Sequence, residues 1–336
     1  MRVQSPKIAR RGRRRGVAPA VTTGFFATDL HGSEVCFRKF LNAAEFYGAD
    51  VLILGGDLTG KFVVPVVEHD DGSFTAELFG DERGVDADAL EGFEREVADK
   101  GLYAKRMTPD ERERYRRDPA AVDRIFEEQM AERLAGWIEL AKEKLAGTDV
   151  RVLCAPGNDD PFFIDDVIRE HGEDRVLLVE GELYELAPGH QMLSTGYSNR
   201  TPWNTHRELS EPELRAHIDE IAAKLDSPRT AVFNIHVPPY DSGIDIAPAL
   251  NEDLSVKTSA GAQLTEPVGS TAVRDALEHY QPLLSLHGHV HEADGTARLG
   301  ETVAMNAGSE YPDGRLRGVL FSVGNGNLVR HQATVG

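Results

Sequence analysis

Five short apolar runs in this chain are each followed directly by side chains that can bind a metal ion. The polar segments after the runs are Asp29-Leu30-His31, Gly55-Gly56-Asp57, Gly157-Asn158-Asp159, His236 and Gly288-His289-Val290-His291. Each run is short and rich in β-forming residues, as a buried strand would be. Neighbouring strands lie about 5 Å apart, so loops at strand ends can bring side chains from distant segments to one point. The pattern therefore favours a fold in which five strand ends meet.

The apolar runs alternate with helical patterns. Residues 21–28 are predicted to form a strand, and apolar residues at helical spacing follow over 35–46. Residues 51–54 then form the next buried strand. Such a βαβ unit implies a parallel strand pair and a right-handed crossover. A long helix is predicted over 122–145, with an apolar stripe at steps of three and four residues that consists of Val122, Phe126, Met130, Leu134, Trp137, Ile138, Ala141 and Leu145.

The pattern changes between residues 61 and 119. Two strand-like runs, 62–67 and 74–79, flank Asp70-Asp71-Gly72, which is a good hairpin turn. A strongly charged stretch follows. We predict one domain over 21–336 with an insertion at about 61–119 that lies beside the site. The sequence leaves open whether this insertion forms part of a substrate cleft or is a solvated elaboration.

Composition narrows the functional classes. The chain has 336 residues and a formal net charge of −19, which argues against tight nucleic-acid binding through clustered Lys and Arg. No apolar run approaches the roughly 20 residues that span a bilayer, so no membrane association is expected. Two cysteines in so long a chain do not form a disulfide framework, and we predict a cytoplasmic location. Cys154 ends an apolar run and is predicted to be a core residue.

The first twenty residues differ from the rest, because they are basic and contain no acidic residue. A twin-arginine export signal needs an apolar stretch after its arginines, and residues 16–24 are too weak for one. We predict that 1–20 is a disordered basic tail, with an arm that binds polyanions as the alternative.

The chemistry of the five segments fits a pair of divalent cations, which need one bridging carboxylate and terminal ligands on each side. Asp57 is the predicted bridge, since it is the lone acid after the most apolar strand. Asp29 and His31 alternate on what we predict to be an extended segment, which would point both side chains the same way. His289 and His291 repeat this spacing, and Glu292 and Asp294 are candidates to hydrogen-bond to them. A further histidine, His287, precedes the glycine and is predicted to lie within its strand.

Taken together, these motifs closely resemble the calcineurin-like metallophosphoesterase superfamily, from about residue 25 to residue 309. The resemblance implies a metallo-dependent phosphatase-like α/β fold, a four-layer αββα β-sandwich flanked by helices. It also implies that the first metal is held by Asp29, His31, Asp57 and His291, and the second by Asp57, Asn158, His236 and His289. Residues 306–309 resemble the closing turn of the family. Water activated by the two metals would hydrolyse a phosphoester without a side-chain nucleophile.

One position departs from the family pattern. Many members have a histidine that assists the leaving group where this chain has Asp159. An aspartate beside two cations is a poor general acid, and its charge would disfavour a doubly charged monoester more than a diester. We therefore expect a phosphodiester, and His206 is a candidate for the missing acid. Arg200, Trp203 and Tyr240 are candidates for contacting the substrate.

Several alternatives stay open. The same fold could carry a phosphomonoesterase, or a metal-binding scaffold without catalysis. A metallo-β-lactamase-like hydrolase would need a His-x-His-x-Asp-His string, which is absent. Mixed carboxylate, imidazole and amide ligands suit Mn²⁺, our first choice, and also Fe, Zn²⁺ or Ni²⁺. The expected partner is a small-molecule phosphoester, and the sequence names neither the substrate nor the oligomeric state.

Overall fold

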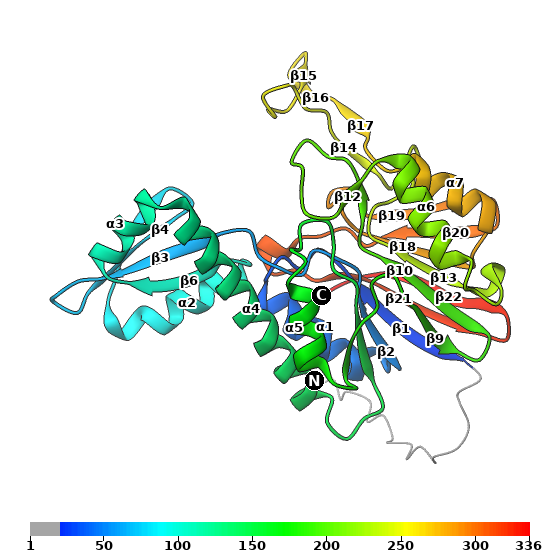
Figure 1. The fold of residues 1–336 in the computed structure, drawn as a ribbon, viewed down its shortest axis with the longest axis horizontal. Coiled ribbons are helices and arrows are strands. Elements are labelled where there is room, and N and C mark those ends of the chain that lie inside the picture. The colour runs from blue at the N-terminus through cyan, green and yellow to red at the C-terminus, as the bar shows by residue number, and fades with distance from the viewer. Residues whose placement is uncertain (1–20) are drawn as a thin grey trace, which may run out of the picture.

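Two six-stranded sheets form the body of the molecule, and the computed structural model describes residues 21–336 (Figure 1). The predicted tail, 1–20, lies outside the described residues. The first sheet has the order β22 (Asn327–Val335), β21 (Arg317–Gly324), β1 (Thr22–Ala27), β2 (Val51–Leu54), β7 (Arg151–Cys154) and β8 (Val176–Leu178). The second has the order β19 (Gly295–Leu299), β20 (Thr302–Asn306), β18 (Leu284–His287), β13 (Val232–Ile235), β10 (His190–Thr195) and β9 (Leu183–Ala187).

The two sheets pack face to face and helices cover both outer faces. Phe26 and Ile53 of the first sheet pack against Leu286 of the second in a shared apolar core. The outer face of the first sheet packs against α1 (Glu34–Tyr47), α4 (Pro119–Lys144) and α5 (Ile164–Gly172). The outer face of the second sheet packs against α6 (Glu211–Ala222) and α7 (Thr271–Tyr280). The layer order is therefore αββα, which confirms the predicted fold class.

Parallel strands place their carboxyl ends at one edge of each sheet. β1 pairs with β2 and β2 with β7, all parallel, and β13 and β18 are parallel neighbours in the second sheet. The predicted β1–α1–β2 unit is confirmed. Cys154, at the end of β7, is buried in the core as predicted.

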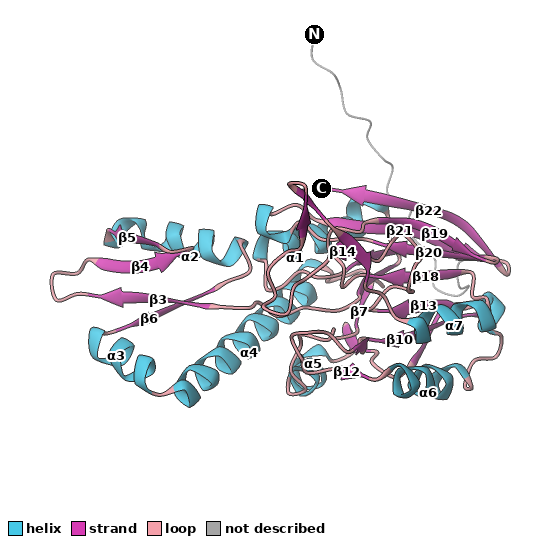
Figure 2. Ribbon diagram, turned by 90° about the horizontal axis from the view of Figure 1, so that it is seen from above, coloured by secondary structure: helices cyan, strands magenta, loops and turns pink. Residues whose placement is uncertain are grey.

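A smaller unit, which we call the lobe (residues 63–117), projects from the body (Figures 1 and 2). Its sheet has the order β5 (Asp81–Val85), β4 (Phe74–Leu78), β3 (Val63–Glu68) and β6 (Tyr103–Met107). The predicted hairpin is confirmed by the antiparallel pairing of β3 with β4. The helices α2 (Leu90–Asp99) and α3 (Pro109–Arg117) complete the lobe, and Phe74 and Phe93 pack in a core of its own.

The lobe holds the loops that follow β1 and β2. The backbone N–H of Gly60 donates to the Tyr103 hydroxyl at 2.7 Å, and the hydroxyl of Ser33 donates to the Asp99 carbonyl at 2.6 Å. Arg133 of α4 donates to the Gly32 carbonyl at 2.7 Å. The lobe and α4 are thus attached to the segments that carry the first two predicted ligand motifs.

Helix α4 connects the lobe with the body, and its apolar stripe is only partly as predicted. Leu134, Trp137 and Ile138 are buried against the first sheet, where Trp137 stacks on Phe37 with ring centroids 4.2 Å apart. Val122 is exposed, contrary to the prediction, because the first turns of the helix extend past the body. In these first turns of α4, Ala121 is buried although Val122 is not.

The remaining elements are short. β11 (Ser198–Asn199) and β12 (Glu208–Leu209) flank the loop that carries Trp203. What we call the arm, residues 246–267, consists of β14 (Ile246–Pro248), β15 (Thr258–Ser259), β16 (Ala262–Gln263) and β17 (Thr265–Pro267), and it extends from the body in Figure 1. The 3₁₀ turns include η1 (Ala87–Ala89), η2 (Pro228–Thr230) and η3 (Tyr311–Asp313). Within residues 21–336, no helix combines the length and apolar character that a membrane crossing requires.

Candidate metal centre

The five predicted segments follow the carboxyl ends of five strands. Asp29, Asp57 and Asn158 come after β1, β2 and β7 in the first sheet. His236 and His289 come after β13 and β18 in the second sheet. Because the two sheets face each other, these strand ends meet. A hydrogen bond joins the two sheets there, since the backbone N–H of His289 donates to Asp29 Oδ2 at 3.0 Å.

Six of the seven predicted ligands form one cluster of carboxylates and imidazoles, and the seventh adjoins it. The His291 Nε2 atom lies 3.3 Å from Asp29 Oδ1, and the His236 Nε2 atom lies 3.4 Å from Asp57 Oδ1. His31 Nε2 lies 3.2 Å from His291 Nε2. Contacts that complete the set are His31 Nε2 to Asp57 Oδ2 at 3.6 Å, His236 Nε2 to Asp29 Oδ1 at 3.8 Å, and Asn158 Oδ1 to His289 Nδ1 at 2.7 Å. The rings of His236 and His289 are in edge contact.

The backbone at these positions is unusual. Asp29, His31, Asp57 and His289 all have positive φ angles, of 53°, 42°, 50° and 65°. Side chains other than glycine rarely adopt this left-handed region, and each such residue costs roughly 1–3 kcal/mol that the surrounding structure must offset. The prediction of an extended Asp29–His31 segment is therefore wrong: the chain turns sharply there, and the turn rather than strand alternation directs both side chains to the cluster.

The glycines of the motifs leave room for the cluster. A Cβ atom on Gly56, where φ is 130°, would lie 2.2 Å from the His236 ring. A Cβ on Gly288 would lie 2.2 Å from Asp29 Oδ2. Both distances are far below van der Waals contact, so only glycine permits the packing seen at these two positions.

Protonation of the cluster suits cation binding. Burial lowers the pKa of His31 to about 3 and that of His289 to about 4, so both imidazoles are neutral near pH 7 and have a free lone pair. Burial also opposes a charge on His236, but the carboxylates of Asp57 and Asp29 outweigh it and raise its pKa to about 10. A cation would balance the same carboxylates and take the place of that proton.

The donor set fits two divalent cations. Asp29, His31 and His291 offer ligand atoms within 4.8 Å of one another, and so do Asp29, Asp57 and His236. The Nε2 atom of His236 is buried and makes no hydrogen bond, although two carboxylates face it. Such an atom is costly unless something binds it. Carboxylate, imidazole and amide donors of this kind suit first-row divalent ions.

Of the two predicted acid–base residues, Asp159 contacts the cluster. The carboxylate of Asp159 accepts from the Lys61 ammonium at 2.9 Å, while its backbone N–H donates to Asp57 Oδ1 at 3.0 Å. His206 has an exposed side chain on the wall of a cleft. The sequence suggested that Asp294 hydrogen-bonds to His289 or His291. Instead, its carboxylate binds the Arg317 guanidinium at 2.6 Å. Glu292 lines the cleft.

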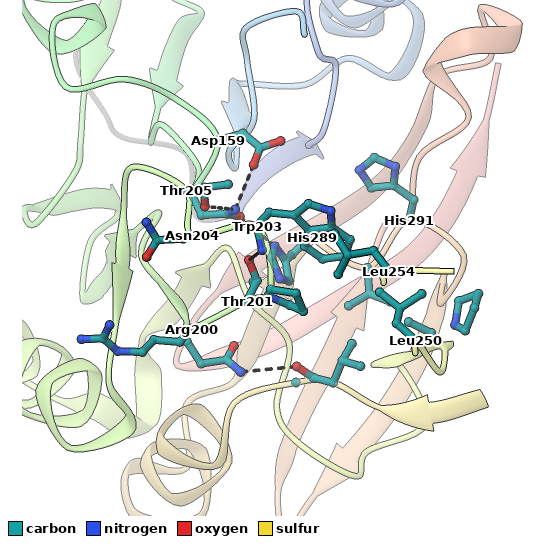
Figure 3. A pocket seen from close by; sticks show the side chains of 18 of the residues that line it. Asp159, Arg200, Thr201, Trp203, Asn204, Thr205, Leu250, Leu254, His289 and His291 are labelled. Carbon is teal, nitrogen blue, oxygen red and sulfur yellow. Dashed lines mark hydrogen bonds between the residues drawn. The ribbon is translucent and has the colours of Figure 1, made fainter. Parts of the chain in front are cut away.

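The cleft opens from the cluster and has a volume of about 1610 Å³. Figure 3 shows His289 and His291 on the same cavity as Trp203, Arg200 and Leu254. The Trp203 loop, the arm, the loop after β2 and the loop after β13 form its walls, and their exposed apolar side chains include Phe62, Trp203, Tyr240, Leu254 and Val256. This volume exceeds the roughly 300–1,000 Å³ of most small-molecule sites.

His287 has the predicted place at the end of β18. It is buried, and its Nδ1 lies 2.8 Å from the Ile235 carbonyl. Residues 306–309 hydrogen-bond to the backbone of two ligand segments. The Ser309 hydroxyl donates to the Asp29 carbonyl at 2.7 Å, and the Asn306 amide donates to the Val290 carbonyl.

Asp160 is a residue whose role the sequence did not indicate. Its buried carboxylate accepts from the backbone N–H groups of Leu58, Thr59 and Gly157, at 2.9, 2.9 and 2.7 Å. It also accepts from the Thr59 hydroxyl at 2.7 Å. Burial and the nearby Asp57 carboxylate raise its pKa to about 6. One side chain thus joins the loop after β2 to the loop after β7.

We expect Asp160→Ala to destabilise the fold by roughly 3 kcal/mol or more, because three buried N–H groups would lose their acceptor at about 1–3 kcal/mol each. Denaturant-induced unfolding measures this. Asp149→Ala, at an exposed acid, is the matched control and should change the free energy of unfolding by less than about 0.5 kcal/mol. Equal stability of the two variants would contradict the role given to Asp160.

Comparison with known proteins is informative at the level of structure only. No protein-family model and no curated protein matches the sequence. One solved structure has a TM-score of 0.57 and 16% identity, covering 94% of this chain and 98% of its own. TT1561 of Thermus thermophilus has a TM-score of 0.50 and 14% identity, with the same coverage. A dimetal phosphatase from Danio rerio has 0.43 and 10%, covering 93% of this chain and 98% of its own.

Likenesses at these identities show the fold alone. The layer order and the structural matches over nearly the whole chain confirm the αββα fold that the motifs predicted. What the site does must be argued from its own residues.

Proposed function

We propose that this chain, which has the metallophosphoesterase fold, is a phosphoric ester hydrolase that uses two divalent metal ions. The observation that carries the proposal is the cluster itself: two buried carboxylates and four imidazoles, from four of the five segments, meet at the inner end of an open cleft. Such ions would supply an activated water molecule and positive charge toward the phosphoryl oxygens.

The residues divide into two ligand sets. We propose Asp29, His31, Asp57 and His291 for one ion, and Asp57, Asn158, His236 and His289 for the other. The geometry supports this division, since His31 and His291 lie together near Asp29. Asn158 and His289 approach each other at 2.7 Å, and the His289 ring contacts that of His236. Asn158 is oriented for this by Thr205, whose hydroxyl accepts from its amide at 2.8 Å.

The substrate is proposed to be a phosphodiester. The sequence argument rested on the charge of Asp159, but the Lys61 ammonium at 2.9 Å compensates that charge. The preference therefore rests on the cleft, which has room for organic groups on both sides of a phosphorus atom. Arg200 suits a phosphoryl oxygen and Trp203 an apolar or aromatic group. A phosphomonoesterase is the second candidate, and Lys61 favours it by adding positive charge near the cluster.

A direct test combines metal analysis with a substrate panel. Metal content would be measured on the purified protein by mass spectrometry, and hydrolysis of paired mono- and diesters would be assayed with Mn²⁺ and after chelation. We expect about two metals per chain and activity that depends on them. A protein that binds metal but hydrolyses no ester would support the scaffold alternative, and one that binds no metal would refute the proposal.

Asp159→His tests the departure from the family pattern. An imidazole at this position should assist the leaving group, and general acid catalysis contributes roughly 10²-fold or more. We expect faster hydrolysis of poorly activated esters and a shift of preference toward monoesters. Unchanged rate and preference would count against a role for residue 159. Asp166→His, on the exposed face of α5, is the control.

A further inference from the structure

Lys61 lies at the inner end of the cleft, four residues after Asp57. Its side chain is 40% exposed, and its ammonium is 2.9 Å from Asp159 Oδ2. Asp159 holds the position at which many members of the resembled family have the histidine that assists the leaving group. The ammonium is therefore delivered to that side of the site by the residue that replaces the histidine.

The backbone under Lys61 is fixed from several sides. Asp160 binds the N–H groups of Leu58 and Thr59, and Tyr103 of the lobe accepts from the N–H of Gly60. A Cβ atom on Gly60 would lie 2.1 Å from the Gly101 carbonyl oxygen, so the segment is packed closely against the lobe. The Lys61 side chain is therefore attached to a well-fixed backbone segment, and Asp159 binds its ammonium group.

The ammonium keeps its charge in this position. Burial opposes the charge, but Asp159 outweighs burial and raises the pKa of Lys61. Asp159, which binds this ammonium, offers a carboxylate oxygen that lies within 4.8 Å of ligand atoms of His31 and Asp57, so the ammonium is next to the cluster. Apart from Lys61, the cations that line the cleft are Arg200 on the Trp203 loop and Lys257 on the arm.

We propose that Lys61 is a catalytic residue that stabilises negative charge on the leaving-group oxygen, with Asp159 as its positioning residue. The inference rests on the proposed function. The oxygen of water forms a new bond to phosphorus while the ester P–O bond breaks, and the leaving oxygen keeps that electron pair. Water gives a proton to solvent and the departing oxygen takes one from solvent, so Lys61 retains its own proton throughout. Preorganised charge of this kind needs no proton transfer.

A series of aryl phosphodiesters with progressively poorer leaving groups, from nitrophenols to phenol, tests the inference on the Mn²⁺-loaded protein. Charge on the leaving oxygen grows along the series, so Lys61→Met should lower kcat about 10²-fold for phenol and only about threefold for the best nitrophenol. KM should change little. Lys61→Arg, which keeps the charge, should recover part of the loss. Lys142→Met, at a surface lysine paired with Glu173, is the matched control.

Two further measurements do not depend on turnover. Metal content and thermal unfolding of Lys61→Met should match wild type, which shows that the lysine neither binds the ions nor holds the fold. The affinity for inorganic phosphate, measured by calorimetry, should fall less than about threefold, because Lys61 faces the leaving group rather than the phosphoryl oxygens that remain. A large fall in phosphate affinity would overturn the assignment.

The outcomes separate this inference from the proposed function. A wild-type protein that is active, with an equal loss or no loss across the series in Lys61→Met, overturns only the role of Lys61. A wild-type protein that binds metal and hydrolyses none of the esters overturns both.

Discussion

Asp57→Asn is expected to remove activity by about 10³-fold or more, since loss of even one group that stabilises transition-state charge costs about 10²–10³-fold. Asp57 is 3% exposed and is the residue that His31 and His236 both approach, at 3.6 and 3.4 Å. Asparagine keeps the shape of the side chain but removes the negative charge and one ligand oxygen. If Asp57 bridges two ions, both sites should weaken together.

Metal content by mass spectrometry and hydrolysis of a diester measure the effect of Asp57→Asn, and thermal unfolding shows whether the fold survives. Asp166→Asn is the matched control, because this acid lies on the exposed face of α5 and pairs only with Arg169 at 2.9 Å. An Asp57→Asn protein that keeps two metals per chain and wild-type turnover would refute the bridging role.

Gly157→Ala is expected to have the next largest effect. An added Cβ would lie 2.2 Å from Asp57 Oδ1 and 2.3 Å from the Asp57 backbone nitrogen. Because one of these atoms belongs to the backbone, the loop after β7 must move away from the loop after β2. A displacement of about 1 Å in a catalytic site can cost roughly 10²-fold in rate, and we expect a loss of that size together with weaker metal binding.

The control for Gly157→Ala is Gly136→Ala, in the middle of α4, where an added Cβ meets nothing within 4 Å. Alanine in a helix interior should stabilise the fold there by about 0.5–1 kcal/mol and leave turnover unchanged. Rates and unfolding temperatures of the two variants give the comparison. If Gly157→Ala hydrolyses esters as fast as wild type, the close packing of the two loops does not govern the site.

The strand ends could be predicted because local patterns encode them. A buried strand such as β2 is a short apolar run, and the ligand motif follows it without a gap. A motif directly after such a run is therefore predicted to lie at the end of that strand. The layer order followed from the motifs through family resemblance. The role of the segments as metal ligands remains a prediction until metal is measured.

Other features could not be read from the sequence because they depend on contacts between distant segments. The left-handed backbone of Asp29 and Asp57 has only a weak signal in residue type, since aspartate is enriched in that region but adopts other conformations far more often. Asp160 gains its role from Leu58 and Thr59, about 100 residues away. Lys61 is one lysine in a charged chain, and only its contact with Asp159 sets it apart.

The hydrogen bonds from Gly60 and Ser33 to the lobe indicate that this unit stabilises the loops of the metal centre. Because the lobe hydrogen-bonds to the two loops that carry Asp29, His31 and Asp57, we expect its folding to be coupled to the formation of the cluster. Hydrogen exchange at those turns should consequently slow in step with exchange at β6. The lobe that projects in Figure 1 therefore supports the loops of the metal centre, and deleting it should loosen the arrangement of the ligands.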